Sequence, residues 1–228
     1  MKALIRRACL VVGSPRPRGR STSESLAREL MKRLQTAGVD CDLFYASSAS
    51  RAGAEQEALM KALSDSELLV LASPIYVNSL PSPVTALLEG IGERFPRDGH
   101  LHMAALLNCG FPEAMHCHLA FRVCKAFCRR TGILWLGALE VGGGGVVDGR
   151  PLSDVGDPVK GLARGLDETA QALARGEPIP QSAREAASQP LLQPWLYRVI
   201  GNIGWLMAGI KAGTITRLWA RPFRPKTR

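Results

Sequence analysis

The residues best suited to chemistry in this chain form a loop of hydroxyl and guanidinium groups at positions 13–23. It reads GSPRPRGRSTS and lies between a short apolar run, residues 8–12, and a helical pattern that begins near residue 23. Unpaired backbone N–H groups and the positive end of the helix dipole meet at the N-terminus of a helix, and both favour an anion. The loop therefore predicts a phosphate site, with hydroxyls and charges from Ser21, Thr22, Ser23, Arg16, Arg18 and Arg20.

The loop matches neither common nucleotide-binding motif. It has no G-x-G-x-x-G pattern, and it lacks the lysine of the P-loop. An alternative interpretation is an ordinary capping box, in which Ser21 caps the helix and Glu24 reaches back, within a solvated basic loop. Both interpretations are open from the sequence.

Composition indicates one domain with an appendage. The chain has 228 residues, of which 46% are apolar and only 6% aromatic, with 23 Gly and 15 Pro. This suits an α/β protein with many tight turns. The first twelve residues imitate a signal peptide, but their apolar run of about five residues is shorter than the roughly 7–15 of a signal sequence. We interpret this run as the first strand of a cytoplasmic protein.

Six cysteines are present, and none forms a C-x-x-C pair. Three of them, Cys117, Cys124 and Cys128, have the spacing of one helix face, near His116 and His118. A metal site there is conceivable, but no ligand set has a recognisable spacing. The simpler interpretation is small apolar residues in a reducing compartment, and we expect no metal.

Alternating strand and helix patterns predict a parallel sheet covered on both faces. Four apolar runs, residues 8–12, 68–72, 103–107 and 133–139, do not alternate, as expected for strands buried on both sides. A fifth, residues 39–45, alternates partly and should form an edge. Helical patterns separate these runs, at residues 23–37, 54–63, 82–94, 114–131 and 159–175. The order favours a doubly wound sheet with right-handed crossovers.

Three further loops follow strands of this sheet, and ligands of such sheets bind at the carboxyl ends of the strands. The loop at 73–83 is stiffened by Pro74, Pro81 and Pro83 and offers Tyr76, which would suit a flat ring or would pack into the core. The loop at 108–113 contains Gly110, which permits close approach. The glycine cluster at 142–145 would close over a ligand or be a plain flexible loop.

Three segments resemble the flavodoxin-like NAD(P)H-dependent FMN reductase family. They are GSPR at 13–16 with the hydroxyls at 21–23, SPIY at 73–76 with Pro81 and Pro83, and NCGFPEA at 108–114 with His116. Together they cover roughly residues 3–145. The third segment is similar to a bacterial branch with a Trp-containing C-terminal tail, which here would be Tyr197, Asn202, Trp205 and RPF at 221–223.

The resemblance implies a three-layer, five-stranded flavodoxin-like domain that binds FMN without a covalent bond and uses NAD(P)H as co-substrate. It implies a phosphate site at Ser14, Arg16, Ser21, Thr22 and Ser23. One side of the isoalloxazine would be edged by Pro74, Ile75, Tyr76, Val77 and Asn78. The other side would be lined by Asn108, Gly110 and Phe111. Iron–sulfur relatives carry a compact cysteine motif after the second strand, and residues 46–56 contain no cysteine, so we expect no cluster.

The implied activity is transfer of electrons from NAD(P)H to a small acceptor such as a quinone, an azo compound or a flavin. The cofactor carries out hydride transfer, so a catalytic triad is not expected. His116 would be a proton donor or a bystander, and Cys109 would be redox-active or a packing residue. The alternatives are an electron carrier for a protein partner, and a non-catalytic flavin-binding module.

The C-terminal part carries most of the net charge of +9. After Glu185 there are seven basic residues and no acidic one. We expect a flavodoxin-like domain over residues 1–176, then a proline-containing linker and an apolar, basic helical arm over 177–228. The apolar stretch at 195–210 is shorter than the roughly 20 residues that span a bilayer. It would pack on protein, within a dimer or larger homo-oligomer, or lie on a membrane surface, or contact nucleic acid, for which no motif is present.

Overall fold

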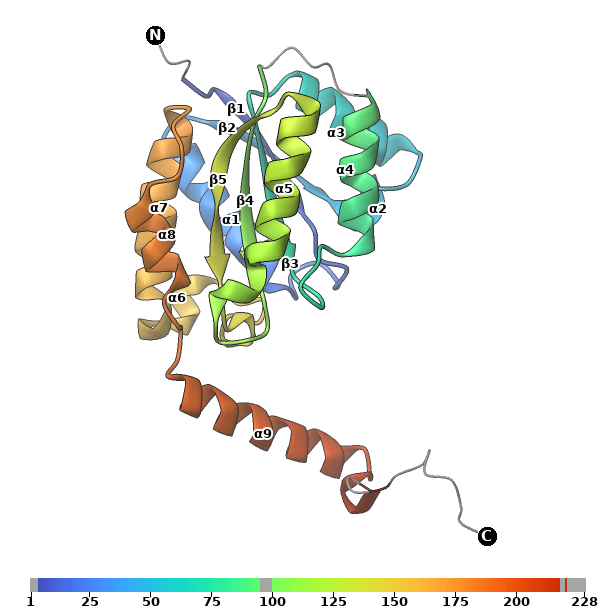
Figure 1. Cartoon of the computed structure of the whole chain (residues 1–228), viewed down its shortest axis with the longest axis vertical. Coiled ribbons are helices and arrows are strands. Elements are labelled where there is room, and N and C mark those ends of the chain that lie inside the picture. The colour runs from blue at the N-terminus through green and yellow to red at the C-terminus, as the bar shows by residue number, and fades with distance from the viewer. Residues whose placement is uncertain (1–3, 95–99, 218–219, 221–228) are drawn as a thin grey trace. The chain divides into compact units, whose positions relative to one another are not determined.

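Five parallel strands form the sheet at the centre of the body (Figure 1). The computed structural model describes residues 4–94, 100–217 and 220. The strands are β1 (Arg7–Val12), β2 (Asp40–Tyr45), β3 (Leu68–Pro74), β4 (His102–Asn108) and β5 (Leu134–Val141). Their spatial order is β2-β1-β3-β4-β5. This is the flavodoxin-type doubly wound order, whose switch point lies between β1 and β3, so the expected fold class is confirmed.

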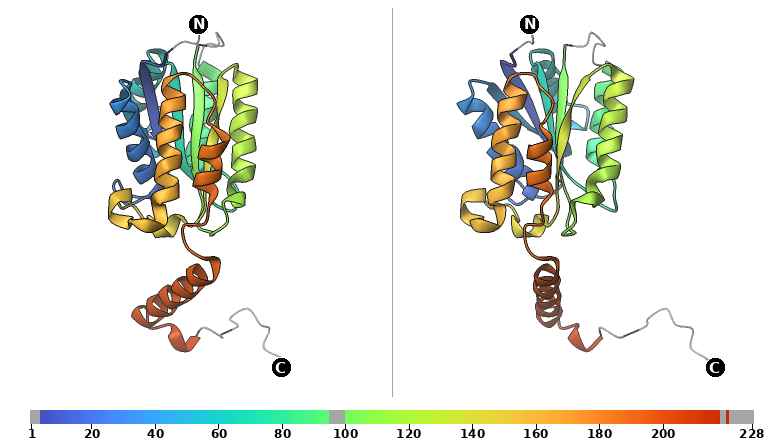
Figure 2. Two further views of the ribbon diagram at one scale, coloured as in Figure 1. Left: turned by 90° about the vertical axis from the view of Figure 1, so that its left-hand side faces the viewer. Right: turned by 60° about the vertical axis from the view of Figure 1, so that its left-hand side comes forward.

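Helices cover both faces of the sheet (Figure 2). One layer consists of α1 (Thr22–Thr36), α7 (Lys160–Ala174) and α8 (Gln181–Ser188), and the other of α3 (Ala54–Ser64), α4 (Ser82–Arg94) and α5 (His118–Thr131). The shorter α2 (Ala46–Ala49) and α6 (Leu152–Val155) lie in connections, and α9 (Pro194–Lys211) follows the body.

Alternate residues of each central strand enter different cores, which explains the unbroken apolar runs. In β1, Leu10 and Val12 pack with the α1 layer, while Cys9 and Val11 pack with the α3 layer. Side chains of a strand point to opposite faces in turn. With both faces covered, apolar residues are required at every position.

The last strand differs from its expectation of burial on both faces. Because β5 is the outer strand beyond β4, its first residues are only partly covered, and Leu134 is 48% exposed. The partly alternating β2 is at the opposite edge, as predicted. The helical pattern at 114–131 is also divided, into a 3-10 turn (Ala114–Cys117) and α5.

The segment interpreted as a linker contains a helix of the body. Helix α8 packs on α7 with Ala183 and Ala187 fully buried, and a Cβ on Gly165 would lie 2.8 Å from the Ala183 carbonyl oxygen. The chain divides into two compact units after Leu191 rather than at residue 176. The body therefore ends fifteen residues later than expected, and the arm begins at residue 192. Trp219 and the RPF segment at 221–223 lie outside the described residues.

Candidate flavin site

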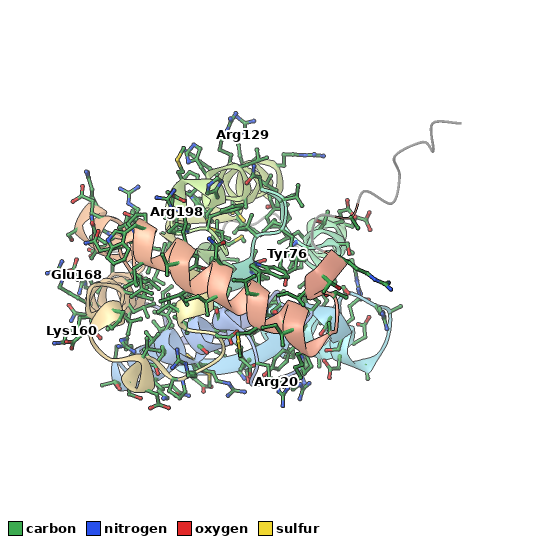
Figure 3. The ribbon with its side chains drawn as sticks, turned by 90° about the horizontal axis from the view of Figure 1, so that it is seen from below. Arg20, Tyr76, Arg129, Lys160, Glu168 and Arg198 are labelled. Atoms are coloured by element: carbon green, nitrogen blue, oxygen red, sulfur yellow. The ribbon has the colours of Figure 1, made fainter. Side chains whose placement is uncertain are left out.

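The loop after β1 is held tightly against the sheet at its first residue. The Gly13 N–H donates to the Ala72 carbonyl oxygen at 2.7 Å, and a Cβ on Gly13 would lie 2.6 Å from Cγ2 of Val84. Only glycine fits this position without displacing a neighbour. The loop then runs over the carboxyl edge of the sheet to the N-terminus of α1. Figure 3 looks onto this edge, where Arg20 and Tyr76 are labelled.

Four hydroxyl side chains of the loop turn inward rather than into solvent. Ser14, Ser21, Thr22 and Ser23 are each at most 7% exposed. Across the described part of the chain, the backbone N–H groups of Thr22 and Ser23 have no protein acceptor. Buried hydroxyls and unpaired N–H groups at a helix N-terminus have the donor chemistry that a phosphate requires.

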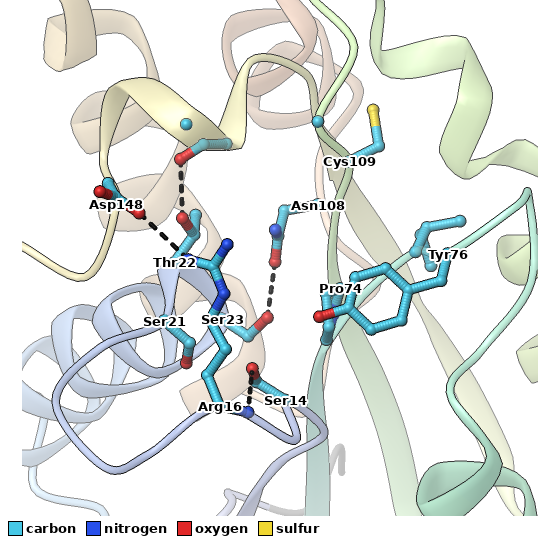
Figure 4. Close-up of a pocket in the computed structure, with 14 residues that line it drawn as sticks. Ser14, Arg16, Ser21, Thr22, Ser23, Pro74, Tyr76, Asn108, Cys109 and Asp148 are labelled. Atoms are coloured by element: carbon cyan, nitrogen blue, oxygen red, sulfur yellow. Dashed lines mark hydrogen bonds and ion pairs between the residues drawn. The ribbon is translucent and has the colours of Figure 1, made fainter. Parts of the chain in front are cut away.

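Two of these hydroxyls connect the loop to the next strands. Ser23 Oγ donates to Asn108 Oδ1 at the end of β4, and Thr22 Oγ1 donates to the Gly144 carbonyl oxygen after β5, both at 2.7 Å. At the mouth, the Arg16 guanidinium lies 3.1 Å from Asp148 Oδ1 (Figure 4). The loops after β1, β4 and β5 therefore surround one point at the carboxyl edge.

These loops enclose a small cavity of about 120 Å³. Ten of the thirteen residues expected from the resemblance line it: Ser14, Arg16, Ser21, Thr22, Ser23, Pro74, Ile75, Tyr76, Asn108 and Gly110. The cavity is also lined by Cys109, Gly144, Gly145 and Asp148. The fold thus brings together residues as far apart in the sequence as Ser14 and Asp148.

Three of the expected residues do not line the cavity. Val77 and Asn78 form the tip of a turn closed by two hydrogen bonds of 3.0 Å between Tyr76 and Ser79, and both have left-handed backbone angles. Val77 is 99% exposed. Phe111 is also exposed, and its ring lies 4.4 Å from that of His116. Their contact with a ring at the rim of the cavity stays a prediction.

The loop arginines differ in position. Only Arg16 lines the cavity; Arg18 lies over the ring of Tyr45 at 4.4 Å and 3.7 Å from Glu55. The expectation that all three arginines are within reach of one phosphate is therefore wrong for Arg18. Its neighbours on β2 and α3 were not recognisable from the loop sequence.

The capping interpretation of Ser21 is confirmed in part. Ser21 Oγ accepts from the Glu24 N–H at 3.2 Å, but the Glu24 carboxylate accepts from the N–H of Gly19 at 2.6 Å rather than from that of Ser21. The carboxylate closes the loop on itself. Because Ser21 is only the acceptor in its bond to Glu24, its hydroxyl proton is not used there, and capping does not prevent ligand binding.

Glu24 is a buried anion held by three donors. Burial raises the pKa of Glu24, but hydrogen bonds from the Gly19 N–H, Tyr45 and Arg28 outweigh it, and the pKa lies below its ordinary value. Tyr45 Oη donates at 2.7 Å and Arg28 Nε at 2.9 Å, both to Oε1. A lowered native pKa stabilises the fold above the unfolded pKa, and that stability is lost as pH falls through the native pKa.

We expect Glu24→Gln to lower the free energy of unfolding at pH 7 by about 1–3 kcal/mol, since hydrogen bonds to a charged group are replaced by weaker ones. Below about pH 5 the stability of the wild type should fall as Glu24 becomes protonated, whereas glutamine does not titrate, so the stability of the variant should depend less on pH there. Urea unfolding between pH 3 and 7 measures both effects. Tyr45→Phe, which removes one donor, is the matched control and should show a smaller loss. Equal pH dependence in Glu24→Gln and wild type would contradict this role.

The four cysteines between the end of β4 and the end of α5 fall into two pairs. Burial raises the pKa of Cys124 and of Cys128 to about 12, as expected for packing residues on the buried face of α5. A hydrogen bond from the Cys117 thiol, opposed by burial, lowers the pKa of Cys109, and this pairing and burial raise that of Cys117. Cys109 is among the residues that line the cavity, but its Sγ points away from Asn108 (Figure 4) and donates to the carbonyl oxygens of Phe111 and Glu113 at 3.4 and 3.5 Å. Its redox and packing roles both stay predictions. Within residues 4–94, 100–217 and 220, no group of three or more His, Cys, Asp or Glu side chains could hold a metal ion.

Of the lining residues that were not expected, the glycines could have been found from the sequence, but Asp148 could not. The glycine cluster at 142–145 was recognisable, and its reason is now clear: a Cβ on Gly144 would lie 3.1 Å from both Asn108 Nδ2 and the Cys109 carbonyl oxygen. Asp148 gave no signal, because a single acidic residue in a glycine-rich loop has no distinctive spacing. Only its pairing with Arg16 reveals it.

The sequence model of the NADPH-dependent FMN reductase family matches residues 7–105 of this chain. The match runs from β1 into β4, so it includes the loops after β1 and β3 and ends before those after β4 and β5. It confirms the resemblance to these reductases over that part of the chain. A search of curated proteins gives no match.

Solved structures agree with the fold. The chain is similar to the rubredoxin oxygen:oxidoreductase of Desulfovibrio gigas, at 16% identity and a TM-score of 0.55, over 75% of this chain and 35% of that chain. It is similar to a proposed quinone reductase of Klebsiella pneumoniae, at 15% identity and 0.53, over 77% and 87%. It is also similar to a cysteine-to-serine variant of the Pseudomonas aeruginosa flavodoxin, at 17% and 0.50, over 73% and 98%. Identities this low support the flavodoxin-like fold alone.

Proposed function

We propose that this chain is an FMN-dependent oxidoreductase that takes electrons from NAD(P)H. The observation that carries the proposal is the buried hydroxyl cluster at the N-terminus of α1, which meets the loops after β3, β4 and β5 at one cavity. The family match supports the enzyme class, FMN as the cofactor and NAD(P)H as co-substrate. The switch-point position of the cavity supports a ligand at this edge.

The loop after β1 binds the phosphate of the cofactor. The N–H groups of Thr22 and Ser23 and the hydroxyls of Ser14 and Ser21 donate to its oxygens, and Arg16 adds a positive charge at the mouth. The helix dipole of α1 favours the same anion. Burial of the hydroxyls orders the donors before the ligand arrives, which reduces the entropy lost on binding.

The remaining lining residues position the ring. At about 120 Å³ the cavity is smaller than the roughly 300–1,000 Å³ of typical cofactor pockets. The phosphate therefore fills the cavity and the ring lies along its rim. Pro74, Ile75 and Tyr76 form an apolar wall on one side, and the loop from Asn108 to Phe111 forms the other. Val77 and Asn78 meet the ring from the exposed turn.

The cofactor, when bound, supplies the hydride and electron chemistry. The residues of the chain bind it, orient it and limit the access of water to one face. The acceptor is a small molecule, with a quinone, an azo compound or a free flavin as the classes implied by the resemblance. We place the protein in the cytoplasm as a homo-oligomer, a dimer or a tetramer.

Titration of the purified protein with FMN tests the proposal. We expect a yellow complex that absorbs near 450 nm, and bleaching of that band by NADPH under anaerobic conditions. Riboflavin, which lacks the phosphate, should bind at least tenfold more weakly. A protein that binds neither flavin would overturn the assignment. FMN binding without bleaching by NADPH or NADH would favour an electron carrier for a protein partner.

Asp148 competes with the phosphate for Arg16, and this leads to a prediction. We expect Asp148→Asn to strengthen FMN binding about two- to fivefold, a change within the range of exposed ion pairs. Asparagine tolerates the left-handed backbone of residue 148 (φ 44°), so the loop should keep its shape. Fluorescence titration measures the affinity. Asp154→Asn, outside the cavity lining, is the control, and an equal gain there would indicate a general effect of charge.

A further inference from the structure

Helix α9, over Pro194–Lys211, has two unlike faces. At about 100° per residue, one arc of the helix collects most of its bulky apolar side chains. The opposite arc carries Gly201, Gly204 and Ala208, together with the amphipathic rings of Tyr197 and Trp205, of which Trp205 is 80% exposed. The bulky face consists of Trp195, Leu196, Val199, Ile200, Ile203, Leu206, Met207 and Ile210. Such a division is typical of a helix that places one side in an apolar environment.

The bulky side chains of α9 are unusually exposed. Val199, Ile200, Ile203, Leu206 and Ile210 are each 45–59% exposed, and Trp195 and Met207 slightly more. A contiguous apolar surface of this kind on a protein marks an interaction site. Across the residues that the structure describes, no helix is both long enough and apolar enough to cross a bilayer.

The positive charge of the arm indicates what kind of surface α9 contacts. Arg198, Lys211 and Arg217 belong to the arm, and four more basic residues follow at positions 221–228. With no acidic residue after Glu185, the arm carries seven of the nine net charges and leaves the body at +2. Two arms of like charge would repel each other, so charge disfavours the arm of a second copy as the partner of this face. A surface with many negative charges is the complementary partner.

We propose that α9 lies in the surface of an anionic lipid bilayer, with its bulky apolar face among the acyl chains and the arm's cations at the headgroups. Tryptophan and arginine suit this boundary, because each combines apolar and polar parts. Basic residues next to such a helix strengthen its binding to anionic lipids. This docking is independent of the flavin.

Docking on a bilayer would also favour one class of electron acceptor over the others, an inference that rests on the proposed function. A body tethered to a bilayer meets lipid-dissolved molecules at a raised local concentration. A lipid-soluble quinone is then the favoured acceptor: with NAD(P)H and one proton it yields NAD(P)+ and the quinol, so that two electrons and two protons reach the quinone.

Vesicle flotation of the full-length protein tests the docking. We expect binding to vesicles of phosphatidylcholine with about one-third phosphatidylglycerol, at least tenfold weaker binding to phosphatidylcholine alone, and release by 0.5 M NaCl. The tryptophan emission should shift to the blue on binding. Ile203→Glu should weaken binding at least tenfold. Ala208→Glu adds the same charge on the opposite face and should weaken it much less.

Each of the following results would overturn the docking: no binding to anionic vesicles at low salt, equal effects of Ile203→Glu and Ala208→Glu, or an arm-dependent dimer in sedimentation without vesicle binding. Retention of a DNA duplex without vesicle binding would also overturn it. FMN titration of the same preparations shows that the body is intact. If the protein floats with vesicles but binds no FMN, only the proposed function fails. If it binds FMN but does not float, only the docking fails.

Discussion

Replacement of Ser14 by aspartate is expected to weaken FMN binding by at least 100-fold. Ser14 is 2% exposed and lines the cavity, and its Oγ accepts from the Arg16 N–H at 3.3 Å. A carboxylate at about 4–5 Å from the phosphate would repel it by roughly 3–4 kcal/mol at an effective dielectric constant of about 20. Isothermal titration with FMN measures the effect.

Ser14→Asn is the matched control for this prediction. Asparagine and aspartate have similar shapes, and both can accept the Arg16 N–H in an Asx turn. The pair therefore differs mainly in charge, and Ser14→Asn should retain FMN binding to within about tenfold. Riboflavin affinity should differ little between the two variants, because riboflavin carries no phosphate. Equal losses of FMN in the two variants would mean that size, and not charge, decides binding at Ser14.

The second large effect is expected at Gly142, where the loop after β5 touches the loop after β4. A Cβ on this buried glycine would lie 2.1 Å from the Pro112 carbonyl oxygen and 2.9 Å from the Ala114 nitrogen. Neighbouring hydrogen bonds hold the contact, from the Gly143 N–H to Phe111 at 2.6 Å and from the Gly144 N–H to Cys109 at 2.9 Å. Backbone atoms on both sides leave no flexible group to move.

We expect Gly142→Ala to lower the free energy of unfolding by about 3 kcal/mol, at the upper end of ordinary overpacking. Because Gly144 accepts the Thr22 hydroxyl, displacement of this loop should also weaken FMN binding. Urea unfolding measures the stability. The control is Gly90→Ala inside α4, where a Cβ meets only the end of the Gln56 side chain at 3.6 Å. That change should be neutral or stabilising by about 0.5–1 kcal/mol. Equal stabilities of the two variants would show that the close contact is not a constraint.

The central strands could be predicted because a strand covered on both faces needs apolar residues at consecutive positions, and such a run is visible in the sequence. Apolar residues fill every position from 8 to 12 in β1, from 68 to 72 in β3 and from 103 to 107 in β4, and helices cover each side. The weakly alternating β2 was correctly placed at an edge. Hydroxyls at the start of α1 marked the phosphate loop, because a helix N-terminus has the same local chemistry in any fold.

Helix α8 was missed because small residues carry little signal. Its buried face consists of Ala183, Ala186 and Ala187, and prolines stand on either side. Alanine is apolar enough to be buried but not bulky enough to show a clear period. The fit depends on Gly165 of α7, which approaches the backbone of α8, and this contact is known only when both helices are in place.

The chain by itself determined the sheet, the order of its helices and the phosphate loop, because local periodicity and backbone chemistry act over a few residues. The tertiary structure decided which groups meet. It turned Arg18 toward Tyr45, paired Arg16 with Asp148, and set the Gly142 and Gly144 backbone against the loop after β4. These contacts join residues far apart in sequence. They depend on distances and directions in space, which residue spacing along a chain does not record.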